Sequence, residues 1–193
     1  TQPEEEKMDT DTIIRRHVGF AMIAGAIPVP LVDIAAVTAI QMDLVKELAR
    51  VYDVDFSQER SRALATTLIG TTVGNLIGRA GASAIKAIPG IGTLLGIGSM
   101  AVFAGASTYA LGKVFENHFR EGGDLFDFDV ERMKQKFRDF FDRGKKVARE
   151  MRDTKSREDI LATLEKLKEL KDSGAITEEE FEKTKQELLD KLK

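Results

Sequence analysis

The sequence contains no cysteine and no tryptophan, and its two histidines, His17 and His118, lie about a hundred residues apart. The absence of cysteine excludes disulfides and thiolate metal sites, and it is compatible with a reducing cytoplasm. With a single histidine available at either place, a zinc site would need carboxylates to complete it. We therefore expect no metal, no cofactor and no catalytic residue, which means a protein that is not an enzyme.

Nucleotide-binding motifs are lacking as well. A P-loop requires a glycine, four further residues and then Gly-Lys-Ser/Thr, whereas Gly112-Lys113 is followed by Val114. The formal net charge of -3 argues against the whole chain binding nucleic acid. The first ten residues, TQPEEEKMDT, are acidic and polar, unlike a secretory signal or a transit peptide. We expect a protein of the cytoplasm, or of a membrane face that is exposed to it.

Charge is missing above all from the middle of the chain. Residues 87–112 form a run of 26 residues without a charged side chain, which is long enough to cross a bilayer as a helix. The preceding uncharged stretch, 63–78, is rich in threonine and has only 16 residues before Arg79. We expect a Gly-rich helical hairpin over 63–115, with its turn at Pro89-Gly90. This hairpin would insert into a membrane, re-enter it, lie on it, or be buried in a soluble helical assembly.

Glycines spaced four residues apart are typical of helices that approach each other closely. Two basic residues near the hairpin tip, Arg79 and Lys86, would each cost about 2.5 to 3.5 kcal/mol at the centre of a membrane helix. We expect both to reach lipid headgroups, or to pair with acids in a soluble assembly. The glycines predicted to pack helices are Gly70, Gly74 and Gly78 in the first arm, and Gly92 and Gly96 in the second.

The hydrophobic periodicity along the chain predicts an all-α protein. We expect a disordered acidic lead over residues 1–9, followed by two Gly/Pro-punctuated helical hairpins over 10–121. A basic amphipathic helix is predicted over 127–153, and a separate two-helix module over 156–193. Helix caps are predicted at Asp11 or Thr12, at Ser57, at Asp127 or Asp129, at Gly174 and at Thr177.

The predicted helix after residue 127 is strongly basic. Between Arg132 and Arg152, nine basic residues stand against three acidic ones. Next to a hairpin that could enter a membrane, such a helix favours binding to anionic headgroups. The alternative is a helix that packs its phenylalanines on the bundle and leaves a solvated basic face. The residues predicted to contact headgroups are Arg132, Lys136, Phe137, Phe140, Phe141, Lys145, Lys146 and Arg149.

The C-terminal module consists of two short amphipathic helices. One runs from Asp159 to Lys171, and the other begins after the capping box formed by Thr177 and Glu180. Two helices of this length cannot bury a core of their own, so they must dock on something, most simply on copies of themselves. The residues predicted for oligomerisation are Leu164, Leu167, Leu170, Phe181, Leu188 and Leu189.

Two resemblances follow from these motifs. The stretch LEKLKELKDSGAITEEEFEKTKQELL resembles a SHOCT module, a short C-terminal domain of many bacterial proteins, which implies a bacterial source and a role in oligomerisation or docking. Residues 13–119, through AIPVPLVD at 26–33, Gln41 and IPGIG at 88–92, resemble the YcjF-like helical domain of unknown function. That family is often joined to Era-like or dynamin-like GTPase domains and is commonly membrane-associated. No GTPase domain fits in 193 residues, so a GTPase partner would act in trans.

Together these features predict a non-enzymatic, membrane-associated scaffold that forms homo-oligomers. Its expected partners are copies of itself and an anionic lipid membrane, at the cytoplasmic face of the bacterial inner membrane, with no nucleic acid. Two alternatives stay open. One is a soluble helical homo-oligomer, and the other is an adaptor or regulatory subunit for a GTPase acting in trans.

Overall fold

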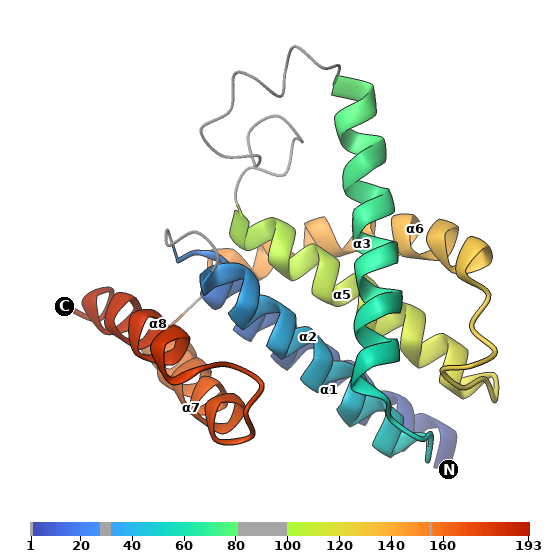
Figure 1. Ribbon diagram of the computed structural model, residues 1–193, viewed down its shortest axis with the longest axis horizontal. Coiled ribbons are helices and arrows are strands. Elements are labelled where there is room, and N and C mark those ends of the chain that lie inside the picture. The colour runs from blue at the N-terminus through green and yellow to red at the C-terminus, as the bar shows by residue number, and fades with distance from the viewer. Residues whose placement is uncertain (1, 28–31, 81–99, 155) are drawn as a thin grey trace.

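The computed structural model describes residues 2–27, 32–80, 100–154 and 156–193, with side chains described from Thr10 onward except at 32–33 and 76–80. Within these ranges the chain forms seven helices and no strand, so the predicted all-α class is confirmed. The helices are α1 (Gln2–Gly25), α2 (Val32–Val51), α3 (Gln58–Ala80), α5 (Met100–Arg120), α6 (Val130–Arg152), α7 (Arg157–Asp172) and α8 (Glu178–Asp190) (Figure 1).

Helix α5 lies at the centre of the bundle. It contacts α1, α2 and α6, and most of its residues are buried. Glycines in α5 allow these helices to approach closely. A Cβ atom built on Gly105 would lie 2.5 Å from Met22 Cγ, and one on Gly112 would lie 2.8 Å from Ile14 Cγ1. At such short separations the apolar side chains of neighbouring helices make dense dispersion contacts, which stabilise the bundle.

Buried hydrogen bonds fix the register of α5 against α1 and α2. The Gln41 side-chain amide on α2 donates to Ser107 Oγ at 3.2 Å and to Thr108 Oγ1 at 3.1 Å. Thr10 Oγ1 on α1 donates to the buried carboxylate of Glu116 at 2.9 Å. Sliding one helix past another would leave these buried groups unpaired, which costs about 1 to 3 kcal/mol for each group.

The second arm of the predicted membrane hairpin is therefore a core helix where the structure describes it. Residues 87–99 lie outside the described residues, whereas 100–112 belong to α5 and pack on helices of the same chain. Neighbouring helices of the same chain bury this apolar surface, so lipid is not required to remove it from water. Among the described residues, no helix is both long enough and apolar enough to cross a membrane.

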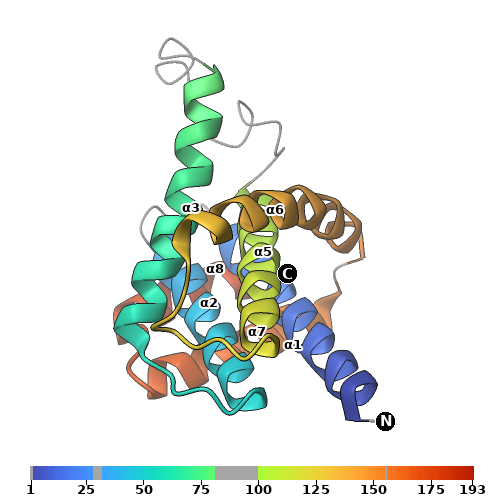
Figure 2. The same ribbon diagram turned by 90° about the vertical axis from the view of Figure 1, so that its right-hand side faces the viewer.

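Helix α3 projects from the bundle. Its first half packs on α2 and α6 through Leu64, Ala65 and Leu68, and its C-terminal end extends away from the other helices (Figures 1 and 2). The arms of the predicted central hairpin thus diverge from each other. A Cβ atom on Gly70 or Gly74 would meet nothing within 4 Å, so neither glycine packs against another helix in the part of the chain that the structure describes. The surroundings of Gly78, Gly92 and Gly96 lie outside the description.

The helix ends follow the predicted caps, with one exception. Arg60 N–H faces Ser57 Oγ at 3.4 Å, Asp129 caps α6, Thr177 and Glu180 form a capping box, and Gly174 follows α7 with a φ of +78°.

The exception is the first helix. Helix α1 begins at Gln2, so Asp11 and Thr12 lie inside the helix, and residues 2–9 are helical where a disordered lead was predicted. The sequence PEEE suits a first helical turn, because proline lacks the donor that would be unpaired there and acidic residues complement the helix dipole.

We expect the contact between α5 and α6 to depend on Gly144. A Cβ atom there would lie 2.8 Å from the backbone oxygen of Ala106 and 3.0 Å from its Cα, neither of which can move aside without shifting α5. Gly144→Ala should lower the free energy of unfolding by about 1 to 3 kcal/mol, although alanine is the better helix former. Urea denaturation followed by circular dichroism measures this change.

The matched control is Gly19→Ala in α1. Its Cβ would make only an ordinary contact, 3.6 Å from the flexible end of Met151. This variant should gain up to about 1 kcal/mol from helix propensity. Equal stability changes in the two variants would contradict the role given to Gly144.

Candidate functional site

The phenylalanines of α6 point into the bundle. Phe137 and Phe141 are 0% and 3% exposed, and the Phe141 ring lies 5.7 Å from that of Phe103 on α5. Phe140 is partly buried, with the Arg143 guanidinium 5.5 Å from its ring centre. The prediction that Phe137 and Phe141 contact headgroups is therefore corrected, because both side chains are buried against other helices of the same chain.

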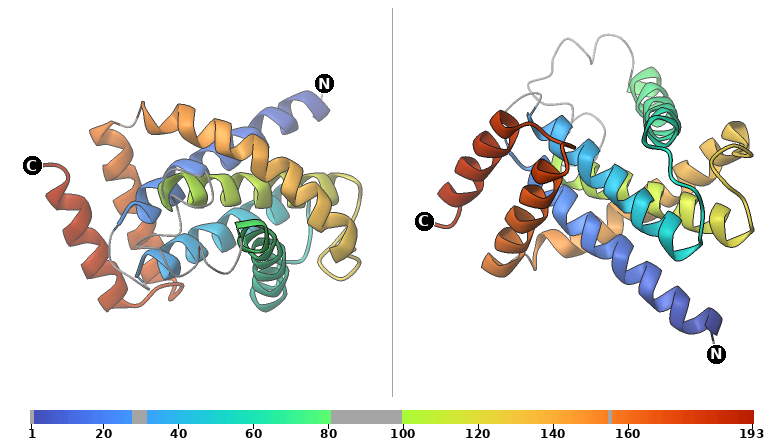
Figure 3. Two further views of the ribbon diagram at one scale, coloured as in Figure 1. Left: turned by 90° about the horizontal axis from the view of Figure 1, so that it is seen from above. Right: turned by 60° about the horizontal axis from the view of Figure 1, so that its bottom comes forward.

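The basic side of α6 faces away from the bundle. Three of its basic residues are exposed, namely Arg132, Lys146 and Arg149. Two others are partly buried: Lys136 Nζ lies 3.6 Å from Glu121 Oε1, and Lys145 Nζ lies 2.7 Å from Asp142 Oδ1. Helix α6 covers the side of the bundle from which α3 rises (Figures 2 and 3). The basic face and the projecting arm therefore lie on the same side of the molecule. The side chains of Arg79 and Lys86 lie outside the description.

The C-terminal helices dock on their own chain. Helices α7 and α8 contact α1 and α2, and their apolar residues form one cluster with Phe20, Ile23 and Ile40. The prediction that these residues join subunits is corrected where they are buried, because the chain itself supplies the docking surface. The buried residues are Leu167, Leu170, Phe181 and Leu188, while Leu164 is partly buried and Leu189 is 37% exposed.

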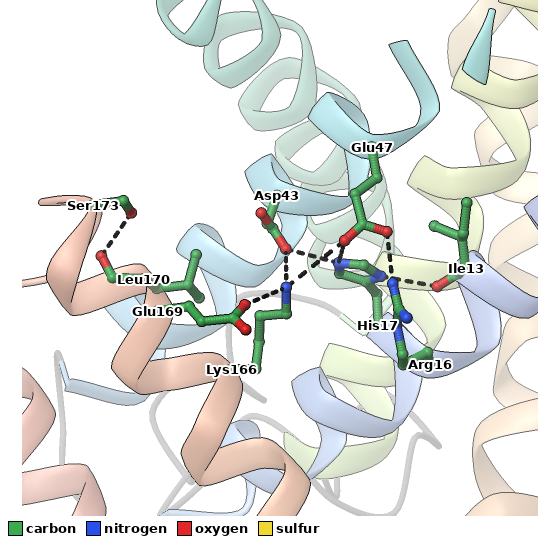
Figure 4. Close-up of polar contacts among 9 residues, drawn as sticks. All are labelled: Ile13, Arg16, His17, Asp43, Glu47, Lys166, Glu169, Leu170 and Ser173. Carbon is green, nitrogen blue, oxygen red and sulfur yellow. Dashed lines mark hydrogen bonds and ion pairs between the residues drawn. The ribbon is translucent and has the colours of Figure 1, made fainter. Parts of the chain in front are cut away.

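A polar cluster lies at this junction, where three helices meet (Figure 4). His17 comes from α1, Asp43 and Glu47 stand one turn apart on α2, and Lys166 comes from α7. His17 Nε2 lies 3.1 Å from Asp43 Oδ2 and 4.0 Å from Glu47 Oε1. Lys166 Nζ lies 2.8 Å from Asp43 Oδ2 and 3.7 Å from Glu47 Oε1. The cluster ties the C-terminal module to the first helical hairpin.

Groups outside the cluster hold its side chains in place. His17 is fully buried, and its Nδ1 lies 2.8 Å from the carbonyl oxygen of Ile13, one turn earlier in α1. The Arg16 guanidinium donates to Glu47 Oε2 at 2.7 Å. Glu47 Oε1 is thereby left facing His17 and Lys166. The ligand-like atoms of His17, Asp43 and Glu47 all lie within 4.8 Å of one another.

The charge of Asp43 is strongly favoured. Burial alone would raise the pKa of this carboxyl, but hydrogen bonds from His17 and Lys166, together with the positive charge of Lys166, outweigh burial and lower the pKa to about 2. Burial likewise opposes the charge of Lys166, yet its bonds to Asp43 and Glu169 raise the pKa of the ammonium. The ion pair at the junction therefore persists at neutral pH.

The sequence did not single out this cluster. Asp43 and Glu47 belong to the polar side of an amphipathic helix, and their spacing of four places both carboxylates on one face. That spacing was the available signal, but the sequence does not reveal that His17 and Lys166 pack against that face. The other histidine, His118, lies elsewhere. Its Nε2 is 3.0 Å from Asp127 Oδ1 and 2.7 Å from the carbonyl oxygen of Asp124, in the loop before α6.

The Asp43 carboxylate should contribute to stability in a pH-dependent way. Its pKa is lowered from 3.8 to about 2 on folding. The stabilisation is therefore fully present above pH 3.8 and is lost as the pH falls toward 2. Asp43→Asn should lower the free energy of unfolding by about 2 kcal/mol at pH 7, and by about half as much at pH 3. Urea denaturation of both proteins between pH 7 and pH 3 measures the difference.

The control for this prediction is Asp139→Asn, which removes an exposed carboxylate from α6. It should change stability by less than about 0.5 kcal/mol at every pH. A difference between wild type and Asp43→Asn that stays constant down to pH 3 would contradict the assignment.

Comparison with known proteins finds a matching family for each of the two parts of the chain. Residues 5–146 match the family described as Domain of unknown function (DUF697), and residues 162–189 match the Short C-terminal domain, SHOCT. Magnetosome membrane protein 22 of Magnetospirillum gryphiswaldense is 40% identical over 139 residues, which cover 72% of this chain and 71% of that relative. No solved structure matches the chain. Both resemblances seen in the sequence are confirmed, and the chain belongs to the DUF697, or YcjF-like, family and carries a SHOCT domain.

Proposed function

We propose that this protein is a non-enzymatic, membrane-associated scaffold that binds the lipid surface with the side of the bundle formed by α3 and α6. The observation that carries the proposal is the projecting helix α3, whose stretch from Ala63 to Gly78 bears no charge. A relative that is 40% identical is named a magnetosome membrane protein, which supports a membrane setting for this chain as well.

Two threonines of α3, Thr67 and Thr71, suit an apolar environment. Thr67 Oγ1 donates to the carbonyl oxygen of Ala63 at 2.9 Å, and Thr71 Oγ1 donates to that of Thr67 at 2.8 Å. Each hydroxyl is satisfied within the helix, so it loses little when water is removed. The arm can therefore enter the interfacial region of a bilayer, or pack against another helix, without leaving these donors unpaired.

The basic face of α6 supplies the second contact. An anionic surface attracts each nearby lysine or arginine by about 1 kcal/mol, and the attraction falls off within a Debye length. Because α6 lies on the side from which α3 projects, one orientation of the molecule brings both helices to the membrane (Figure 3). The proposed headgroup contacts are Arg132, Lys146 and Arg149, at the cytoplasmic face of a bacterial membrane.

Scaffolding requires that copies of the chain associate, and we place that contact on α3. Most leucines of the SHOCT helices already pack against residues of the same chain, whereas Gly70 and Gly74 have open space around them. Glycines spaced by four allow two helices to approach closely in lipid or in water. The same contact between α3 helices would also hold together a soluble homo-oligomer, which is the alternative to a membrane-bound one. A GTPase partner acting in trans rests on the family resemblance alone.

Flotation with liposomes tests the membrane contact. The wild-type protein should float with vesicles of phosphatidylcholine containing phosphatidylglycerol, and less with phosphatidylcholine alone. Arg132→Glu/Lys146→Glu should lower the bound fraction on anionic vesicles at least tenfold, since two attractions of about 1 kcal/mol each become repulsions. Thr67→Glu/Gly74→Glu should weaken binding to both vesicle types, because each adds a charge to the arm.

Charge reversal on the C-terminal module, Lys168→Glu/Lys183→Glu, is the matched control, and these exposed positions should leave flotation unchanged. Full recovery of the wild-type protein in the unbound fraction at low salt would overturn the membrane proposal.

Light scattering tests the contact between copies. Gly74→Leu should reduce the size of the oligomer, because a leucine there prevents two α3 helices from approaching closely. The fold of the single chain should tolerate it, since a Cβ at this position meets nothing within 4 Å. Asn75→Leu, at the exposed neighbouring position, adds the same side chain without removing a glycine and should preserve the oligomer. An unchanged oligomer in Gly74→Leu would remove α3 from the assembly.

A further inference from the structure

We propose that His17, Asp43 and Glu47 form a binding site for a divalent transition-metal ion, and that Lys166 of the SHOCT module occupies this site when the module is docked. The metal ion and the docked module would then compete for the same carboxylates. The inference concerns the junction between α1, α2 and α7, so it is independent of the membrane contact proposed for α3 and α6.

The three side chains have the composition of a metal site. One imidazole nitrogen and two carboxylates suit ions such as Zn²⁺, Fe²⁺ or Mn²⁺. Metal–ligand bonds of about 2.1 Å place neighbouring ligand atoms roughly 3.0 to 3.4 Å apart. His17 Nε2 lies 3.1 Å from Asp43 Oδ2 and 4.0 Å from Glu47 Oε1, so small side-chain movements suffice. The remaining coordination positions would hold water.

The surroundings of His17 resemble those of a metal-ligating histidine. Such histidines direct one ring nitrogen at the metal and donate from the other to a carbonyl or a carboxylate. Nδ1 of His17 faces the carbonyl oxygen of Ile13 at 2.8 Å, while Nε2 faces Asp43. Both partners are hydrogen-bond acceptors. With a metal ion on Nε2, the Nδ1–H group would still donate to the carbonyl oxygen of Ile13.

Helix α1 also orients the second carboxylate. Arg16, adjacent to His17, donates to Glu47 Oε2 and leaves Oε1 directed toward the imidazole. His17 and Glu47 are therefore each held by a contact within the helical domain itself. None of these orienting contacts involves the SHOCT module.

Lys166 places a positive charge where the ion would bind. Its Nζ lies 2.8 Å from Asp43 Oδ2 and 3.7 Å from Glu47 Oε1, and Glu169 on α7 holds it at 3.0 Å. An ammonium group and a divalent ion cannot share these oxygens without strong repulsion at such short range. Binding of the metal must therefore weaken docking of α7, and docking must weaken metal binding by the same factor.

Isothermal titration calorimetry of the intact chain with Zn²⁺ tests the site. Lys166→Met should bind one Zn²⁺ per chain at least tenfold more tightly than the wild type, because it removes the competing charge and keeps the length of the side chain. Lys168→Met removes an exposed charge from the same helix and should leave the affinity unchanged. Asp43→Asn combined with Lys166→Met should abolish the tight site.

Hydrogen exchange measures the second half of the proposal. Saturating Zn²⁺ should accelerate exchange of the α7 amides around Leu167 and Leu170 in the wild type, and should have no such effect in Asp43→Asn. Equal Zn²⁺ affinity of Lys166→Met and wild type would overturn the competition. Zn²⁺ binding that survives Asp43→Asn would overturn the site, and so would failure of Lys166→Met to bind Zn²⁺.

Discussion

Close approach of the neighbouring helices to α5 is the constraint on which the rest of the structure depends. At Gly105 and Gly112 in α5, and at Gly144 in α6, a single added carbon would collide with an adjacent helix. These positions set the separation of the helices, and the separation decides which side chains can reach across. Gln41 reaches Ser107 and Thr108 only because α2 lies close to α5. Packing and register are therefore specified together.

The same constraint explains which sequence-based expectations hold. Local features were predictable, because a cap such as Asp129 or the box of Thr177 and Glu180 depends on residues within one turn. Helix positions, the all-α class and both family resemblances follow from periodicity and motifs of this kind. Glycine spacing alone did not reveal which glycines pack. Those at 70 and 74 face open space, while Gly105 and Gly144, which lack that spacing, make close contacts.

The partner of each apolar face was the least predictable property. An uncharged run such as 100–112 satisfies a length criterion for lipid, yet the same residues are equally suited to the centre of a helical bundle. The leucines of α7 and α8 needed a surface that the sequence does not identify, and α1 and α2 of the same chain provide it. The cluster of His17, Asp43, Glu47 and Lys166 joins three helices that are distant in sequence, so the local spacing of its two carboxylates does not reveal its other members.

The central position of α5 also has a consequence for the order of events on the ribosome. Helices α1 and α2 are synthesised well before α5, and although they contact each other, the apolar surface that each packs on α5 has no partner until α5 emerges. At about 5 to 20 residues per second, the roughly 70 residues between the end of α2 and the end of α5 take about 4 to 14 s. During this interval the nascent chain exposes the α5-facing surfaces of two helices and the uncharged stretch 63–78 of α3. A chaperone or a lipid surface near the ribosome exit could therefore engage this chain before its bundle closes.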